Sequence, residues 1–310
     1  MIGRLDHVAL GVADLDGAAD RWAQQFGLTL REHDGASARL SCDDEPYSLE
    51  LLAGQPPGLH HVAWELQRGC SLDDARARLG AAEERDGALW TADPDGNGIE
   101  LLPYREPDSR LVPQARPAQP GSPAGHPRKL GHVNFLTAAL DEQLRFYSEV
   151  LGMRITDWLG DGGVWFHIST DHHVMALISL PRPRAPHFHH LAFELVDIGQ
   201  MRTALDHLGR HGRWLGWGPV RHGVGGNIAS YVRICEEECF VELYCDMEQL
   251  QAYHQPRRWP DDRFSSNTWG QLPPRSYFRF DQAAIESERE SLEMLGVPLA
   301  PPPGAQRVSA

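Results

Sequence analysis

The sequence contains few cysteines, no long apolar run and no excess of basic residues. Five cysteines among 310 residues are an odd and sparse set, which favours free thiols in a reducing compartment over a disulfide framework. No apolar stretch approaches the ~18 residues that a membrane-spanning helix needs. The formal net charge of −14 is opposite to the charge of proteins that bind nucleic acid or anionic membranes. We therefore expect no nucleic-acid partner and no membrane partner.

The sequence also lacks targeting and zinc-binding patterns. Its first residues, MIGRLDHVALGVADLD, have neither the basic start nor the apolar centre of a signal peptide, so we expect a cytoplasmic protein. Cys235, Cys239 and Cys245 lie close together, but a fourth ligand at the spacing of a structural zinc site is missing. The acidic run 236–238 between the first two of these cysteines indicates a hairpin turn.

Internal repetition is the most informative feature that is present. Four short segments begin alike: LDHVALGV, LHHVAWEL, LGHVNFLT and FHHLAFEL. Each places a histidine (His7, His61, His132 or His190) directly before alternating apolar residues, which is the pattern of a half-buried strand. A glycine follows 20 residues after His7 and after His132, and 19 residues after His61 and after His190.

Each repeat has the same expected order of elements. An amphipathic helix fills the space between histidine and glycine, as the spacing of Ala19, Trp22 and Phe26 shows in the first repeat. The glycines Gly27, Gly80, Gly152 and Gly209 are expected to end these helices. About three strands follow in each repeat. The sequence therefore predicts an α+β fold of four βαβββ modules, paired into two domains.

The domain boundaries follow from composition. We expect an N-terminal domain of two modules over residues 1–104 and a proline-rich linker over residues 105–128. A C-terminal catalytic domain of two modules, with an aromatic tail, is expected over residues 129–280. A helix and a frayed end are expected over residues 281–310.

This ordered pattern resembles the vicinal oxygen chelate superfamily, whose fold is named after glyoxalase, bleomycin resistance protein and dioxygenase. The two-domain arrangement is similar to the type I extradiol ring-cleavage dioxygenases, the group of catechol 2,3-dioxygenase and biphenyl-2,3-diol dioxygenase. The resemblance covers roughly residues 3 to 280 and is densest between residues 130 and 245. It implies cupped sheets that hold a metal ion.

Three residues of the C-terminal repeats form the expected metal site: His132, His190 and Glu242. Two imidazoles and one carboxylate are the facial ligand set of non-haem Fe(II) oxygenases, and the resemblance assigns that role to these three positions. His190 is preferred over His189 because it precedes Leu-Ala-Phe as His132 precedes Val-Asn-Phe. Fe(II) is the expected ion, and Mn(II) fits the same ligands.

The resemblance also implies groups that handle protons and substrate. His173, in the phrase His-Val-Met-Ala, matches the acid–base histidine of these enzymes. His222 and Tyr231 have the nine-residue spacing of a second pair near the substrate hydroxyl groups. Trp165 either lines the substrate pocket or packs in the core.

The N-terminal repeats retain His7, His61 and Glu100 at the corresponding points, so a second ligand set can be written. Tyr47 stands where His173 would be expected, and Trp90 where Tyr231 would be. In the enzymes that this sequence resembles, the N-terminal domain is usually a structural relic without metal. We therefore expect this domain to act as a scaffold, while its ability to bind metal stays open.

The implied function is Fe(II)-dependent extradiol cleavage of a catechol-type ring with O2, an oxidoreductase reaction that gives a semialdehyde or keto-acid product. The implied partners are a small aromatic diol and O2, with homo-oligomerisation by analogy. One alternative is a non-oxidative protein of the same superfamily, either a metal-dependent isomerase or lyase or a ligand-sequestering resistance protein. The other is a partner-binding scaffold.

Overall fold

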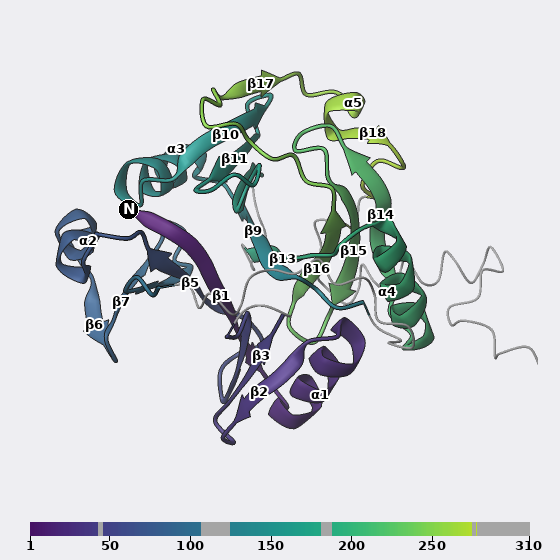
Figure 1. Cartoon of the computed structure of the whole chain (residues 1–310), viewed down its shortest axis with the longest axis horizontal. Helices are drawn as coiled ribbons and strands as arrows, with labels where there is room; N and C mark the ends of the chain where they lie inside the picture. Colours follow the sequence, from purple (N-terminus) through teal and green to yellow (C-terminus); the bar gives the residue numbers. More distant parts are fainter. Residues whose placement is uncertain (43–45, 107–124, 181–187, 275–276, 278–310) are drawn as a thin grey trace, which may run out of the picture.

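The computed structural model describes residues 1–42, 46–106, 125–180, 188–274 and 277. The described part of the chain forms two mixed β-sheets with helices on their outer faces (Figure 1). Each sheet contains two consecutive strand–helix–strand–strand–strand modules, to which the C-terminal sheet adds two short strands. The α+β expectation is therefore confirmed. The predicted helix and frayed end over 281–310, and most of the predicted linker, lie outside the described residues.

The N-terminal sheet has eight strands in the order β2-β3-β4-β1-β5-β8-β7-β6. Its first module comprises β1 (Ile2–Val12), α1 (Leu15–Phe26), β2 (Thr29–His33), β3 (Ser37–Ser41) and β4 (Leu49–Ala53). Its second comprises β5 (Gly58–Leu66), α2 (Leu72–Leu79), β6 (Glu83–Arg85), β7 (Ala88–Ala92) and β8 (Gly98–Leu102).

The C-terminal sheet has ten strands in the order β17-β10-β11-β12-β9-β13-β16-β15-β14-β18. Its first module comprises β9 (Lys129–Thr137), α3 (Leu140–Arg145) with the π-helical turn η1 (Phe146–Val150), β10 (Arg154–Leu159), β11 (Gly163–His167) and β12 (Met175–Ser179). Its second comprises β13 (Phe188–Glu194), α4 (Ile198–Arg210), β14 (Leu215–His222), β15 (Ile228–Ile234) and β16 (Cys239–Cys245). After these come β17 (Arg257–Trp259), α5 (Arg263–Ser266) and β18 (Asn267–Trp269).

The strand that opens each module lies at the centre of its sheet. β1 pairs antiparallel with β5, and β9 pairs antiparallel with β13. Each of these strands also runs parallel to the last strand of its own module: β1 with β4, β5 with β8, β9 with β12 and β13 with β16. The histidines that open the repeats therefore meet in pairs at the middle of each sheet.

The predicted helix faces and most of the predicted helix ends are present. Ala19, Trp22 and Phe26 of α1 are buried, and Gly27 follows the helix in the left-handed conformation with φ of 70°. The prediction was wrong for the fourth module, because Gly209 lies inside α4. That helix runs to Arg210, and the left-handed position is taken by Gly212, with φ of 73°.

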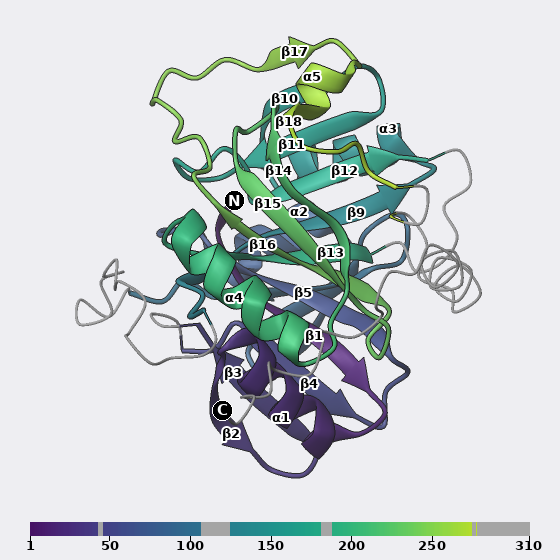
Figure 2. The same cartoon turned by 90° about the vertical axis from the view of Figure 1, so that its right-hand side faces the viewer.

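The two halves contact each other through the helices of the first and fourth modules. In Figure 2, α1 and α4 lie next to each other. The His207 ring on α4 donates from Nε2 to the backbone oxygen of Gln24 at 2.7 Å. Arg213 Nε donates to Gln25 Oε1 at 2.6 Å. Among the described residues, no helix is both long and apolar enough to cross a bilayer.

Candidate active site

Three adjacent strands bring His132, His190 and Glu242 together on one face of the C-terminal sheet. His132 on β9 and Glu242 on β16 lie directly opposite Ala192 on the strand between them, β13. His190 is two residues before Ala192 and therefore points to the same face. The methyl group of Ala192 leaves room for the three larger side chains.

The three side chains converge on one carboxylate oxygen. Glu242 Oε2 lies 3.0 Å from His132 Nε2 and 3.1 Å from His190 Nε2. All three residues are buried. Burial would raise the pKa of the Glu242 carboxyl, but His132 and His190 beside it outweigh burial and hold that pKa well below its usual range. Glu242 is therefore ionised at neutral pH.

A chain of hydrogen bonds fixes the orientation of His190. Burial holds the pKa of His189 well below its usual value, so His189 is neutral and donates from Nε2 to the backbone oxygen of Tyr277 at 2.9 Å. Its Nδ1 then accepts from the Nδ1–H of His190 at 2.7 Å. The lone pair of His190 Nε2 consequently faces Glu242. Such a partner on the distal nitrogen is typical of metal-bound histidine.

The carboxylate of Glu242 is also held from its other side. Asn227 Nδ2 donates to Glu242 Oε1 at 2.9 Å, and Asn227 is buried. Oε2 is thereby left to face the two histidines. The four-residue turn between β15 and β16 preserves this register, because Tyr231 lies directly opposite Glu242. The predicted turn at residues 236–238 is present.

His173 lies over His132, with ring centroids 4.3 Å apart. Behind it, His172 Nε2 donates to Asp157 Oδ2 at 3.0 Å, and His172 Nδ1 lies 3.0 Å from His173 Nδ1. Asp157 is ionised: burial would raise its pKa, but hydrogen bonds from His172, Arg257 and Trp259 prevail and lower it to about 2. His172 therefore accepts from the Nδ1–H of His173, whose Nε2 lone pair remains available.

His222 and Tyr231 form a direct hydrogen bond of 2.8 Å between Nε2 and the hydroxyl group. His222 Nδ1 lies 3.1 Å from the backbone oxygen of Ser266, which can only accept. The proton of His222 is therefore on Nδ1, and the Tyr231 hydroxyl donates to Nε2. Burial lowers the pKa of His222 and raises that of Tyr231 well above its usual value, so both are neutral at neutral pH.

One cavity of about 190 Å³ is lined by the three candidate ligands and by His173, His222 and Tyr231. Its lining includes every residue that the sequence predicted for the C-terminal site: His132, Trp165, His173, His190, His222, Tyr231 and Glu242. Trp217 also lines it and stacks on Tyr231 at 5.1 Å between ring centroids. Ser265, Ser266 and Tyr277, from the segment after the last module, line it as well.

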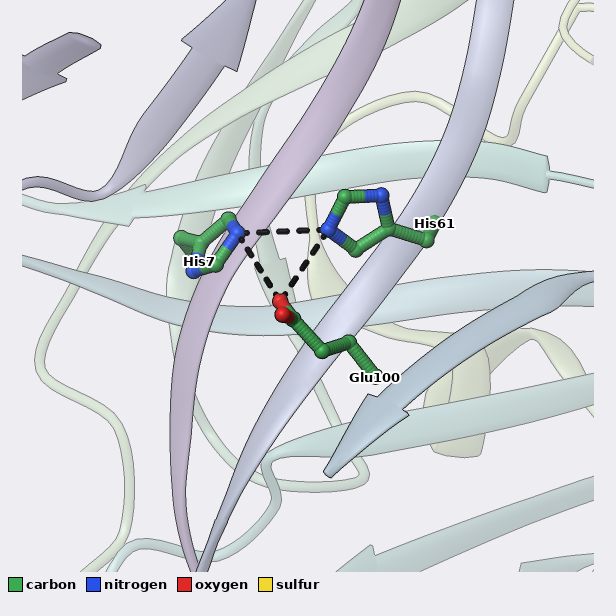
Figure 3. Close-up of side chains that lie close together, drawn as sticks. All are labelled: His7, His61 and Glu100. Carbon is green, nitrogen blue, oxygen red and sulfur yellow. Dashed lines mark hydrogen bonds and ion pairs between the residues drawn. The ribbon is translucent and has the colours of Figure 1, made fainter. Parts of the chain in front are cut away.

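The N-terminal sheet repeats the arrangement of the three candidate ligands. His7 and Glu100 lie opposite Ala63 on the two neighbouring strands, and His61 is two residues before Ala63. Figure 3 shows the two imidazoles and the carboxylate pointing toward one point. Burial, partly offset by the nearby Glu100, lowers the pKa of His7 to about 4.

The groups around this second set differ from those of the C-terminal site. The Tyr47 ring lies 4.6 Å from that of His7, as His173 lies over His132. Trp90 lies opposite Glu100, as Tyr231 lies opposite Glu242. The two substitutions predicted by alignment of the repeats are therefore confirmed.

Sequence reasoning missed the residues that support the site. Asn227, His172, His189 and Trp217 were not predicted to have a role. The sequence did contain a signal for two of them, the adjacent histidine pairs His172-His173 and His189-His190. In each pair the two Nδ1 atoms lie 2.7–3.0 Å apart. Asn227 lies in a glycine-rich stretch that gave no indication of its contact.

None of the five cysteines, all of which lie in the described part of the chain, is joined by a disulfide. The groups of described residues that could hold a metal ion include no cysteine. Cys239 and Cys245 stand at opposite ends of β16. Burial raises the pKa of Cys239 well above its usual value and that of Cys245 to about 12, so both thiols stay protonated at neutral pH.

Comparisons with known proteins agree with this geometry. Metapyrocatechase 2 of Cupriavidus necator is 27% identical over 305 residues, which cover 90% of this chain and 92% of that protein. An iron-dependent extradiol dioxygenase of Rhodococcus jostii (strain RHA1) is 28% identical over 200 residues, covering 54% and 63% of the two chains.

Solved structures share the fold. Homoprotocatechuate 2,3-dioxygenase from Arthrobacter globiformis superimposes with a TM-score of 0.76 at 22% identity, covering 90% of this chain and 91% of that one. The Mn(II)-bound glyoxalase from Novosphingobium aromaticivorans gives a TM-score of 0.75 at 22% identity, with coverage of 89% and 93%.

The family model described as Glyoxalase/Bleomycin resistance protein/Dioxygenase superfamily matches residues 129–240, which contain His132, His173, His190, His222 and Tyr231. The resemblance predicted from the repeats is therefore confirmed: these residues form a domain of the glyoxalase/bleomycin resistance protein/dioxygenase superfamily.

Proposed function

We propose that this protein is a metal-dependent extradiol dioxygenase, which uses O2 to open the ring of a catechol-type substrate. The observation that carries the proposal is the single cavity in which three candidate ligands, three candidate proton-handling groups and an aromatic wall meet. The similarity to proteins named metapyrocatechase 2 and iron-dependent extradiol dioxygenase supports it.

The C-terminal residues fit a divalent metal ion. His190 Nε2 presents a lone pair, and Glu242 Oε2 is an ionised acceptor 3.1 Å away. Two acceptors this close repel each other unless a cation lies between them. His132, His190 and Glu242 would hold Fe(II), or Mn(II) with the same ligands. The bound ion would supply adjacent open positions for the two diol oxygens and O2, and a path for electrons between them.

We assign His173 the role of accepting and returning a proton. Its buried ring is neutral, since burial holds its pKa well below the usual value. The hydrogen bond to His172 places the lone pair on Nε2, so His173 enters the reaction as a base toward a diol hydroxyl group. Once protonated, it becomes the acid that donates to developing negative charge on oxygen.

We assign His222 and Tyr231 the role of orienting the substrate hydroxyl groups. Because the Tyr231 hydroxyl donates to His222, its oxygen still has a lone pair with which to accept from a substrate hydroxyl. Trp217, stacked on Tyr231, restricts the phenol to that orientation.

The size of the cavity favours a substrate with one ring. About 190 Å³ is less than the ~300–1,000 Å³ of sites that take drug-sized ligands. Trp165 and Trp217 present ring faces or edges to the cavity, which suits an aromatic substrate.

The test is anaerobic loading with Fe(II) or Mn(II), followed by air and a panel of monocyclic and bicyclic catechols. We expect one O2 consumed per ring opened, with a yellow product. His190→Ala should abolish uptake. His173→Ala should lower kcat by about 10²- to 10⁴-fold, the usual contribution of general acid–base catalysis. His211→Ala, at the exposed end of α4, is the matched control and should behave as wild type.

Two results would count against the proposal. If the C-terminal ligands bind metal stoichiometrically but no catechol consumes O2, the non-oxidative alternative replaces it. If His173→Ala and the control are equally active, the assignment of His173 is wrong.

Further parts of the organisation are proposals of the same kind. We take residues 1–104 and 129–280 as the two domains, and the division of the strands into two sheets supports this. Homo-oligomerisation and a cytoplasmic location remain predictions. Sedimentation of the purified protein would test the first of these.

A further inference from the structure

The N-terminal sheet carries three side chains that can hold one metal ion, and a further carboxylate lies on the neighbouring strand. Glu50, His7, His61 and Glu100 lie on β4, β1, β5 and β8, which are adjacent in that order. We propose that His7, His61 and Glu100 bind a second divalent transition-metal ion, so that the chain holds two ions, one in each sheet. The proposal does not depend on the dioxygenase activity.

The ligand atoms are close enough to share one ion. His7 Nε2 and His61 Nε2 are 3.3 Å apart. Glu100 Oε2 lies 3.3 Å from His61 Nε2 and 3.6 Å from His7 Nε2 (Figure 3). Two atoms that each lie about 2.1 Å from one ion can be at most about 4.2 Å apart, so all three separations satisfy this limit.

The distal nitrogens of both histidines have partners of the kind found at metal sites. His7 Nδ1 lies 2.8 Å from Asp6 Oδ1, and Asp6 is buried. Because a carboxylate only accepts, His7 Nδ1 carries the proton and His7 Nε2 presents a lone pair. His61 Nδ1 lies 2.8 Å from His60 Nδ1, the same doubled-histidine contact that orients His190.

Glu50 adds a second carboxylate beside the cluster, which the C-terminal site lacks. Its Oε2 lies 3.9 Å from His7 Nε2. Arg39 Nε donates to the other oxygen, Oε1, at 2.9 Å, and so directs Oε2 toward the cluster. The corresponding residue of the C-terminal sheet is Ala176, since Glu50 pairs with Ala9 as Ala176 pairs with Asn134. Two carboxylates would neutralise a divalent cation within the sheet.

The surroundings favour a structural ion over a catalytic one. Tyr47 and Trp90 occupy the places of His173 and Tyr231, so the proton-handling groups of the C-terminal site are replaced. The ion would link three strands, β1, β5 and β8. The Glu50 and Glu100 side chains are 11% and 13% exposed, which gives an ion access from solvent.

The experiment counts metal in matched double variants of the full chain. His61→Ala/Glu100→Gln removes the N-terminal set, and His190→Ala/Glu242→Gln removes the equivalent C-terminal residues. Each protein is stripped with chelator, loaded separately with Zn(II), Mn(II) or Fe(II), desalted, and analysed by mass spectrometry of the metal. His33→Ala, an exposed histidine of the same sheet, controls for the loss of an imidazole.

We expect two equivalents of at least one of these ions in the wild type and the control, one in each double variant and none when all four changes are combined. The decisive protein is the C-terminal variant, because its N-terminal cluster is intact and its count needs no activity. A count of zero in that variant for all three ions overturns the proposal. So does one equivalent that persists in the combined variant, since it would come from an unrelated surface site.

A stability measurement provides a second readout. In the C-terminal variant, the loading ion should raise Tm, and the added single change Glu100→Gln should remove the increase. An equal increase with and without Glu100 would overturn the proposal, because the ion would then act elsewhere.

Discussion

The hydrogen bonds that connect Asp157, His172 and His173 allow a prediction that distinguishes a catalytic role of His172 from a packing role. His172→Leu removes the acceptor for the Nδ1–H of His173, while Asp157 keeps its hydrogen bonds from Arg257 and Trp259. Without an acceptor, the buried Nδ1–H of His173 has an unfavourable free energy of about 1–3 kcal/mol. Moving that proton to Nε2 avoids the cost but removes the lone pair that faces the substrate.

Either response of His173 slows proton transfer. A penalty of 1–3 kcal/mol corresponds to a decrease of about 5- to 150-fold in kcat. KM should change little, because His222 and Tyr231 are not in contact with His172. His172→Asn is the matched rescue variant, since its side-chain oxygen lies near the position of Nδ1 and can accept from His173. It should keep kcat within about threefold of wild type.

The assay is initial O2 uptake at saturating catechol, with kcat calculated per bound metal. Thermal unfolding of each variant shows how much of the effect is structural. The reasoning is refuted if His172→Leu retains wild-type kcat. It is also refuted if His172→Asn and His172→Leu lose activity equally, because the acceptor would then have no role.

Three further predictions concern metal retention and pH. Asn227→Ala should lower the metal affinity of His132, His190 and Glu242 about 10- to 100-fold, because Glu242 loses a hydrogen bond. Competition with a chelator measures this affinity, and an unchanged value would contradict the prediction. Ala192→Leu should abolish metal binding by these residues without changing the fold, because the larger side chain enters the space between the ligands. One bound ion per C-terminal site in this variant would contradict the prediction. Burial, despite the nearby Arg21, raises the pKa of Glu237 to about 7. Because its folded pKa exceeds its unfolded one, the stability that Glu237 itself contributes is greatest below about pH 4.5 and falls by about 2–3 kcal/mol as pH rises through 7. Glu237→Gln should remove this loss in denaturant titrations at pH 5 and pH 8, whereas equal pH dependence in both proteins would show that another group is responsible.

The fold could be predicted from sequence because its signals are local and repeated. A histidine before alternating apolar residues marks each opening strand, and a glycine at a fixed distance marks the end of most helices. Where the helix signal failed, at Gly209, a second glycine three residues later was available, and α4 extended to use it. The spacing of the repeat does not reveal which of two nearby glycines takes the left-handed position after the helix.

The candidate site could be predicted only as far as the repeat and the family resemblance extend. His132, His190 and Glu242 lie at repeated positions, and the resemblance assigned them the metal; it also supplied His173, His222 and Tyr231. Asn227 and His172 have no repeated counterpart, because their contacts depend on how a loop folds back over the strands. Their roles follow from distances to Glu242 and Asp157 that no local pattern encodes.

The two sheets differ most in one hairpin, and that difference accounts for their separate chemistry. His61 and Glu100 are 39 residues apart, whereas His190 and Glu242 are 52 apart. The N-terminal hairpin is short, with three residues in β6 and five in β7, but β14 and β15 have eight and seven. The additional length carries His222 and Asn227 to the face where the candidate ligands lie. An insertion that leaves the ligand strands in register can therefore add substrate-orienting groups to one copy. The other copy keeps its three candidate ligands and has no such groups.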